Sequence, residues 1–271
     1  MKIKLLSRND VAQAVSMVEA IRAVKKAFVQ LSAGKAKMPL RTHIAVKKWK
    51  GTALFMPAYL SADDALGIKV VSVFPHNKKR RLATIHAAVI VIDARTGRPL
   101  ALMDGTFLTA LRTGAASGLA TDLLSRKDAR VAAIFGAGTQ SRTQLEAICT
   151  VRAIEKVWVY DIKSRIARSF VKEMRERGSP IPRSILVALS PKQAVREADI
   201  ICTATTSFRP VFNDADLKAG VHINGVGSYT PEMQEVPART VVRSKVVVDS
   251  RRASLVEAGD LIISIGGRIS N

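Results

Sequence analysis

The chain reads Val131-Ala132-Ala133-Ile134-Phe135-Gly136-Ala137-Gly138-Thr139-Gln140-Ser141 at its centre, and this stretch decides the fold. The apolar run 131–135 has the length and branching of a buried parallel strand, and a helical pattern follows the glycines. A second apolar run, residues 157–160, ends in Asp161. This order of strand, glycine turn, helix, strand and acid predicts a dinucleotide-binding βαβ unit.

Each polar feature of this unit has an expected role. Gly136 permits the tight turn, and Gly138 lets backbone N–H groups approach a pyrophosphate at the helix N-terminus. Asp161, about 20 residues further on, can accept hydrogen bonds from a ribose diol. Ser141 stands where the usual pattern has its third glycine. A plain strand–helix turn without a nucleotide is the alternative, and the complete unit favours the nucleotide.

Strand and helix patterns continue to alternate over the second half of the chain. This alternation predicts an α/β fold with a doubly wound parallel sheet of the Rossmann type. Further strands are predicted at residues 185–188, 198–205, 220–227 and 245–249. Ligands of such sheets bind at the carboxyl ends of strands. Besides Gly136 and Asp161, the expected ends are residues 203–207 and 225–229.

The first part of the chain has a different pattern, so residues 1–112 and 113–271 are expected to form separate domains. Helical periodicity over residues 9–33 is interrupted at Ser16, which together with Glu19 resembles a capping box. Short strands with turns between them follow, which predicts a mostly antiparallel α+β domain. A turn at 104–106 then leads into a helix over 107–124, which joins the two domains.

Composition narrows the class of protein. The chain has 271 residues, is 48% hydrophobic and carries a net charge of +21. No apolar window is long enough for a membrane span. The basic residues are spread along the chain without interleaved aromatics, so a basic surface that attracts anionic ligands is favoured over nucleic-acid binding. Cys149 and Cys202 are interpreted as small buried residues in a reducing compartment, and a cytoplasmic protein is expected.

Lys69 is the most informative residue outside the glycine loop, because it interrupts the apolar strand 67–71. It either points to solvent or projects into a cleft, where burial and nearby cations would lower its pKa and suit it to proton transfer. Arg41 and Arg112 are candidate carboxylate clamps, although each alone is typical of a surface arginine. His86 is interpreted as a core or edge residue. No spacing predicts a metal site or a nucleophile elbow.

Taken together, these residues give nearly the whole chain a resemblance to the ornithine cyclodeaminase/mu-crystallin family. The stretches that carry it are residues 56–59, 66–71, 84–87, 104–115, 136–140, 198–201 and 257–260. The resemblance implies an NAD(P)-dependent enzyme that acts on small amino or imino acids. It also implies a homodimer that pairs through the β-rich domain. Members include cyclodeaminases, an alanine dehydrogenase and reductases of cyclic imino acids.

By carry-over from the family, Lys69 would be the acid/base beside the reacting nitrogen, and Arg41 and Arg112 would hold the substrate carboxylate. With the strand ends above, the expected cofactor contacts are Thr84, Gly136, Gly138, Thr139, Gln140, Asp161, Thr203, Gly225, Val226, Gly227 and Ser228. The carboxylate of Asp161 favours NAD by repelling a 2′-phosphate. Lys163 and Arg165 lie close to it in sequence and keep NADP open.

Two departures from the family pattern bear on function. Cyclodeaminases and the alanine dehydrogenase carry an Asp at the position of Ser228, so this chain looks more like the imino-acid reductase branch. Family members usually continue beyond residue 271 and return to the first domain, which suggests a shortened member with impaired activity. The leading hypothesis is reduction of the C=N bond of a cyclic imino acid such as pyrroline-2-carboxylate. Amino-acid deamination with NAD and non-catalytic ligand binding are the alternatives.

Overall fold

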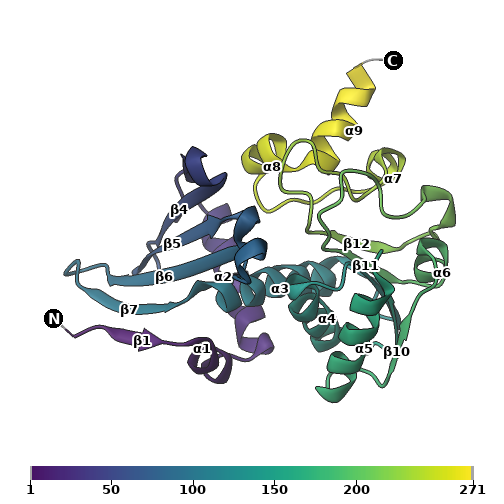
Figure 1. Cartoon of the computed structure of the whole chain (residues 1–271), viewed down its shortest axis with the longest axis horizontal. Coiled ribbons are helices and arrows are strands. Elements are labelled where there is room, and N and C mark those ends of the chain that lie inside the picture. Colours follow the sequence, from purple (N-terminus) through teal and green to yellow (C-terminus); the bar gives the residue numbers. More distant parts are fainter. Residues whose placement is uncertain (1, 270–271) are drawn as a thin grey trace. The chain divides into compact units, whose positions relative to one another are not determined.

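The computed structural model describes residues 2–269, with side chains over that range except for Lys78 and residues 267–269. The chain forms two compact units, residues 1–112 and residues 113–271, and each is described by itself (Figure 1). The boundary falls within helix α3 (Gly105–Leu124), so this helix contributes residues to both units.

The first unit is built on a sheet with the strand order β1-β7-β6-β5-β4-β2, in which β3 also pairs with β4. Its strands are β1 (Lys4–Leu6), β2 (Ala36–Lys37), β3 (Thr42–Val46), β4 (Gly51–Leu60), β5 (Ala65–Val73), β6 (Ile85–Asp93) and β7 (Pro99–Asp104). From β3 to β7 each strand pairs antiparallel with the next one along the chain, as predicted. Strand β1, which the sequence pattern does not predict, pairs parallel with β7.

Side-chain caps set the helix boundaries of the first unit. Helices α1 (Arg8–Ala14) and α2 (Met17–Ser32) meet at the predicted capping box, where the Glu19 carboxylate accepts a hydrogen bond from the Ser16 N–H at 2.9 Å. Helix α3 begins at Gly105, so the prediction of a turn at residues 105–106 is wrong. The Asp104 carboxylate accepts a hydrogen bond from the Phe107 N–H at 2.7 Å and so starts the helix early.

The second unit contains a five-stranded parallel sheet with the order β10-β9-β8-β11-β12. Its strands are β8 (Val131–Phe135), β9 (Lys156–Tyr160), β10 (Ser184–Val187), β11 (Ile200–Thr203) and β12 (His222–Gly225). The chain enters at β8, runs outward to β10 and returns to β11, so the strand order reverses between β8 and β11. This confirms the predicted Rossmann-type sheet, and ligands of such sheets bind at that reversal.

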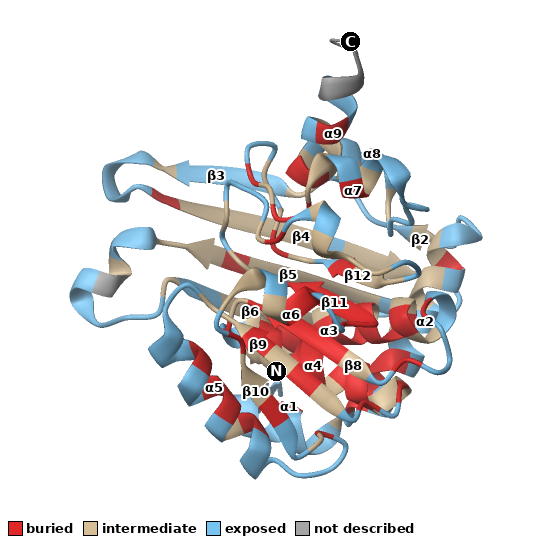
Figure 2. Cartoon of the chain, turned by 90° about the vertical axis from the view of Figure 1, so that its right-hand side faces the viewer, coloured by how far each residue is buried: buried red, intermediate tan, exposed pale blue. Residues whose placement is uncertain are grey.

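Helices cover both faces of this sheet, which is why its strands are nearly continuous apolar runs. The helices of this unit are α4 (Thr139–Val151), α5 (Ser164–Glu176), α6 (Pro191–Val195), α7 (Ala238–Arg243), α8 (Arg251–Glu257) and α9 (Gly259–Ile269). One face packs on Leu145 of α4 and Phe170 of α5, and the other on Val195 of α6 and on Phe212. Figure 2 shows β8, β11 and α4 largely in red, the colour of buried residues.

The predicted strand at residues 245–249 is wrong. This stretch lies between α7 and α8 without strand structure, and Val246, Val247 and Val248 are 49%, 58% and 39% exposed. A run of β-branched residues satisfies the local preference for a strand, but a strand also needs the backbone of a neighbouring strand. Within the described residues, β12 pairs only with β11, so residues 245–249 do not extend the sheet.

The longest helix in the described part of the chain, α3, spans 20 residues, which is about the length that a bilayer requires. Across residues 2–269, no helix combines the length and the apolar character that crossing a membrane requires.

Candidate active site

Lys69 lies in the middle of β5, opposite Met56 of β4 and Val89 of β6. Its side chain is half-buried. Burial, with the nearby cations of Arg112 and Arg41, lowers the pKa of Lys69 from 10.5 to about 8. Of the two interpretations of this lysine, the geometry therefore favours a group of reduced basicity over a solvated surface cation.

Three cations of the first unit meet at this place. Arg41 immediately precedes β3, and Arg112 lies on α3. The positive charges of both nevertheless contribute to the lowered pKa of Lys69. Like charges that are held together repel one another, and a carboxylate bound among them relieves the repulsion. Guanidinium groups offer paired N–H donors to a carboxylate, and the lysine offers a proton that it releases more readily than usual.

Thr84 and His86 lie where β6 begins. The Thr84 carbonyl accepts a hydrogen bond from the Phe74 N–H at 2.8 Å, which closes the connection between β5 and β6. The Thr84 residue is half-buried, whereas His86 is exposed on the strand. Because His86 is exposed near the start of an interior strand, its interpretation as a core or edge residue is wrong. Thr84 stays a candidate cofactor contact.

The glycine loop follows β8 in the second unit. Gly136 has a φ of +83°, in the left-handed region that glycine adopts without strain. A Cβ on Gly136 would lie 2.7 Å from the carbonyl oxygen of Ala204, just beyond β11, so the loop passes the reversal of strand order at close range. Gly138 precedes α4, and a Cβ built on it would meet nothing within 4 Å. The N-terminus of α4 therefore leaves room for a phosphate.

Two side chains of α4 hold this loop in place. The buried Ser141 hydroxyl donates a hydrogen bond to the Gly136 carbonyl at 2.6 Å. The Arg142 guanidinium donates to the Gly138 carbonyl at 2.7 Å and binds the Glu173 carboxylate at 2.6 to 2.9 Å. Sequence reasoning did not single out Arg142, because an arginine in the first turn of a helix has the same pattern as a solvated one.

Asp161 connects the end of β9 to the glycine loop. One carboxylate oxygen accepts a hydrogen bond from the Ala137 N–H at 3.0 Å, and the other accepts from the Lys163 N–H at 2.8 Å. Each oxygen retains a further lone pair, so the carboxylate can still accept hydrogen bonds from a diol. The acid is thus both a part of the loop and a candidate ribose ligand.

The side chain of Gln140 indicates whether this loop can hold a dinucleotide. Its Oε1 atom is buried and has no hydrogen-bond partner among the described residues. Buried polar atoms normally have a partner, so this oxygen is suited to accept a hydrogen bond from a bound molecule. An open helix N-terminus, a buried acceptor beside it and a carboxylate across the loop together fit a dinucleotide.

The carboxyl ends of β11 and β12 are joined by a residue that sequence reasoning missed. Thr203, the last residue of β11, donates a hydrogen bond to the carboxylate of Glu235 at 2.9 Å. The Gly227 N–H, two residues beyond β12, donates to the same carboxylate at 2.6 Å. The only feature of the sequence that marks Glu235 is its place between the apolar residues Met233 and Val236. That pattern does not distinguish a buried acid from an exposed one.

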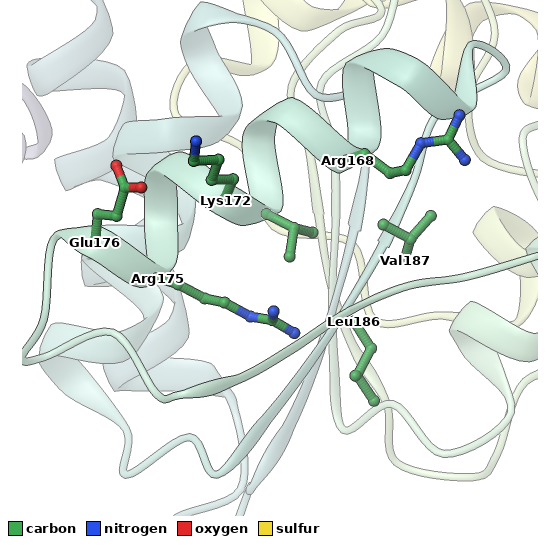
Figure 3. Close-up of a pocket in the computed structure, with 7 residues that line it drawn as sticks. Arg168, Lys172, Arg175, Glu176, Leu186 and Val187 are labelled. Carbon is green, nitrogen blue, oxygen red and sulfur yellow. The ribbon is translucent and has the colours of Figure 1, made fainter.

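A cavity of about 420 Å³ lies elsewhere in the second unit, between α5 and β10 (Figure 3). It is lined by Arg168, Val171, Lys172, Arg175, Glu176, Leu186 and Val187. Arg175 donates a hydrogen bond to the Ile185 carbonyl of β10 at 2.5 Å. None of the candidate residues lines this cavity, so its cations belong to the general basic surface rather than to the candidate site.

Residues 1–266 match the family model described as the ornithine cyclodeaminase/mu-crystallin family. The chain belongs to this family. A Delta(1)-pyrroline-2-carboxylate reductase of Bacillus cereus is 41% identical to it over 263 residues, which are 96% of this chain and 79% of the relative. The expected family membership is therefore confirmed.

Two solved structures of family relatives have the same fold. The Thermococcus litoralis Delta(1)-pyrroline-2-carboxylate reductase, in complex with NADH and L-proline, is 46% identical, with a TM-score of 0.92 over 98% of this chain and 82% of that one. An archaeal alanine dehydrogenase dimer with bound NAD is 34% identical, with a TM-score of 0.89 over 99% of this chain and 81% of that one.

Ser228 lies on the loop that follows β12, and its hydroxyl is bound within that loop and to the start of α9. Its hydroxyl donates a hydrogen bond to the Met233 carbonyl at 2.8 Å and accepts one from the Asp260 N–H at 3.0 Å. Both interactions are with the backbone of the second unit. The hydroxyl therefore fixes the loop, and it brings no carboxylate to a substrate amine.

Metal ions and reactive thiols need particular arrangements of acidic, histidine and cysteine side chains. In the part of the chain that the structure describes, no three His, Cys, Asp or Glu side chains are grouped so that they could hold a metal ion. Cys149 and Cys202 are buried, and burial raises the pKa of both thiols, that of Cys149 to about 12. Both cysteines are inert packing residues, as predicted.

Proposed function

We propose that the chain reduces the C=N bond of a small cyclic imino acid, such as pyrroline-2-carboxylate, with NADH as the reductant. The observation that carries this proposal is the group of three cations, in which Lys69 has a pKa of about 8 beside Arg41 and Arg112. A cyclic imino acid combines a carboxylate with a nitrogen that must gain a proton. L-proline, which a 46% identical relative holds together with NADH, is the reduced form of pyrroline-2-carboxylate.

In this proposal Lys69 is the proton donor. Its ammonium group protonates the ring nitrogen as the C=N bond is reduced, and its lowered pKa makes this transfer easier near neutral pH. Arg41 and Arg112 bind the substrate carboxylate, and the anchored carboxylate places the ring nitrogen near Lys69. When bound, NADH supplies the hydride that the imine carbon accepts.

The residues proposed to hold the cofactor lie mainly in the second unit. The N-terminus of α4, with Gly138, Thr139 and Gln140, binds the pyrophosphate, and Asp161 accepts hydrogen bonds from the adenosine ribose. The remaining proposed contacts are Thr84, Gly136, Thr203, Gly225, Val226, Gly227 and Ser228. The open N-terminus, the free lone pairs of Asp161 and the buried Gln140 oxygen support this assignment.

The test is NADH oxidation with a panel of cyclic imino acids, with Lys69→Ala beside the wild type. We expect turnover by the wild type and a loss of at least about a hundredfold in kcat for the variant, since a positioned proton donor contributes that much. Lys79→Ala is the matched control, because Lys79 is an exposed lysine of the same unit. Full activity of Lys69→Ala would refute the role of the lysine.

The same panel distinguishes the alternatives. Ammonia release from ornithine or alanine with NAD would favour a deaminating enzyme, the activity named for the 34% identical archaeal relative. Cofactor binding without turnover of any amino or imino acid would favour a ligand-binding protein. Ser228 argues against the first alternative, because its hydroxyl is bound to backbone and supplies no carboxylate.

The homodimer is proposed to form through the sheet of the first unit. Leu5, Ile90 and Leu102 are paired across β1, β7 and β6, and successive residues of a strand point to opposite faces. By the same alternation, Lys69 lies on the other face from Ile68, the partner of Ile90. Leu5 and Leu102 are 74% and 39% exposed, which leaves an apolar row for a second copy to cover.

Light scattering after size-exclusion chromatography tests this dimer. We expect a dimer for the wild type and a monomer for Leu102→Asp, because the variant places a charge in an apolar interface. Leu82→Asp is the control, since Leu82 is 54% exposed and lies outside the strands. A monomeric wild type, or a dimeric Leu102→Asp, would refute the proposed surface.

A further inference from the structure

The side chain of Glu235 is fully buried and joins the ends of two neighbouring strands. Its Oε1 atom accepts hydrogen bonds from the Thr205 N–H and the Thr205 hydroxyl, both at 2.6 Å. Its Oε2 atom accepts from the Thr203 hydroxyl at 2.9 Å and from the Gly227 N–H at 2.6 Å. Each oxygen therefore accepts from one hydroxyl and one backbone N–H group.

These donors come from segments far apart in the sequence. Thr203 is the last residue of β11 and Thr205 lies two residues beyond it, whereas Gly227 lies two residues beyond the end of β12. A Cβ on Gly227 would lie 2.3 Å from the Thr205 carbonyl oxygen, so only glycine allows the two segments to pass this closely. The carboxylate thus fixes two strand ends at a separation that leaves no room for adjustment.

The backbone of Glu235 is held in turn by a residue of α9. The Asp260 carboxylate accepts hydrogen bonds from the backbone N–H groups of Glu235 and Val236 at 2.7 and 2.9 Å. The Asp260 N–H donates to the Ser228 hydroxyl, which lies on the loop beyond β12. The loop, the buried acid and the start of α9 therefore form one continuous hydrogen-bond network.

Burying the carboxylate of Glu235 costs desolvation free energy, and a side chain that only filled the space would not have this cost. Burial raises the pKa of Glu235, and the hydrogen bonds from Thr205, Thr203 and Gly227 oppose that rise. An apolar side chain would fill the same space without the desolvation cost, but it would leave two backbone N–H groups and two hydroxyls unpaired. What the carboxylate provides is a fixed position for those four donors.

We propose that Glu235 is a positioning residue that holds the carboxyl ends of β11 and β12 in the geometry that binds the dinucleotide. This inference rests on the proposed function, because ligands of a doubly wound sheet bind at these strand ends. Glu235 acts through Thr203, Thr205 and Gly227, and its own oxygens are fully occupied by them.

Glu235→Gln is the sharpest test, because it keeps the shape and changes one acceptor into a donor. Whichever oxygen becomes NH₂, one backbone N–H, of Thr205 or of Gly227, then faces a donor that it cannot bind. The NADH dissociation constant, measured by fluorescence titration without substrate, is expected to rise by about tenfold or more. At saturating NADH, the KM for the imino acid is expected to change by less than about threefold, since Lys69, Arg41 and Arg112 are untouched.

Two further variants make the test decisive. Glu232→Gln is the matched control, an exposed glutamate on the same loop, and it should leave the NADH dissociation constant unchanged. Thr205→Val removes one hydroxyl donor to Glu235, together with the acceptor of the Ser207 N–H, and keeps the carboxylate with both backbone donors. It should weaken NADH binding by about threefold, and it decides the question if Glu235→Gln does not fold.

An NADH dissociation constant within about twofold of the wild type in folded Glu235→Gln, or in Thr205→Val where the first variant does not fold, overturns the inference. A proportional rise in the KM for the imino acid overturns it too, because that result indicates a general structural defect. Wild-type protein that binds NADH but reduces no imino acid would refute the proposed function and leave the role of Glu235 standing. Wild-type protein that binds no NADH would overturn both.

Discussion

The Ser141 hydroxyl donates a hydrogen bond to the carbonyl oxygen of Gly136 across a distance of 2.6 Å. Gly136 holds its left-handed conformation at one end of the loop, and the fully buried Ser141 closes the other. In the usual pattern the third glycine permits close packing of helix and strand. Here the hydroxyl of a serine connects the two ends of the loop by a hydrogen bond instead.

Replacing Ser141 by alanine tests the contribution of this hydrogen bond. The Gly136 carbonyl would lose its hydroxyl donor, so we expect the free energy of unfolding to fall by about 1 kcal/mol and NADH binding to weaken by about threefold to tenfold. Chemical denaturation and fluorescence titration measure the two effects. Ser164→Ala serves as the control, because Ser164 is exposed in the first turn of α5. Equal NADH affinity in Ser141→Ala and the wild type would contradict a loop that depends on this bond.

The lowered pKa of Lys69 predicts the pH dependence of the reaction. Lys69 must carry its proton in order to donate it, and with a pKa of about 8 the protonated fraction falls as the pH rises through that value. We therefore expect kcat/KM for the imino acid to decline above about pH 8.

The variant Arg112→Gln assigns that decline to Lys69. It removes one of the two cations that lower the pKa, so the descending limb should move to higher pH while the KM for the imino acid rises. A limb that stays in place, or that moves to lower pH, would show that another group controls the profile.

Lys69 should also reduce the stability of the fold. Its pKa is about 8 when folded against 10.5 for an ordinary lysine, so the unfolded chain binds the proton more tightly. The resulting loss of folding stability is fully present below about pH 8 and disappears as the pH rises toward 10.5. Discounted for partial exposure, we expect Lys69→Met to raise the free energy of unfolding at neutral pH by about 1–2 kcal/mol.

Denaturant unfolding at neutral and at alkaline pH measures this effect. The advantage of Lys69→Met over the wild type should shrink as the pH rises, whereas Lys79→Met, at an exposed lysine, should show no such trend. If Lys69→Met were less stable than the wild type at neutral pH, other groups of the fold would have to offset the desolvation and repulsion of the Lys69 cation.

Asp161 predicts the choice between the two nicotinamide cofactors. Its carboxylate is fixed by the N–H groups of Ala137 and Lys163, and a 2′-phosphate placed beside it would be repelled. We expect the wild type to bind NADH at least about tenfold more tightly than NADPH, and Asp161→Asn to narrow that ratio. Isothermal titration with both cofactors measures it. Tighter binding of NADPH by the wild type would assign the dominant role to Lys163 and Arg165.

Much of the fold is predictable because its signals are local. The apolar run 131–135, the glycine turn and the acid at 161 form a pattern that tertiary contacts do not alter. Residues 245–249 carry a similar apolar signal without forming a strand, because a strand depends on a neighbour that the local sequence does not specify. Strand β1 was missed for the opposite reason, since its three residues are a strand only through pairing with β7.

The candidate site is predictable to a smaller extent. Lys69 stands out because a charge interrupts an apolar strand, but only the fold brings Arg112 and Arg41 close to it. Glu232 and Glu235 lie three residues apart in the same polar loop, and one is exposed while the other is fully buried. The burial of Glu235 depends on contacts with β11 and α9, which are distant in sequence and which no local pattern contains.

The central claim is that this chain transfers a hydride from NADH to the C=N carbon of a cyclic imino acid. The most direct measurement is mass spectrometry of the product formed from pyrroline-2-carboxylate and NADH that carries deuterium at both C4 positions. We expect proline with one deuterium at C2, formed by the wild type and by Lys79→Ala but only at a background level by Lys69→Ala. Unlabelled proline, or no proline from protein that binds NADH, would contradict it.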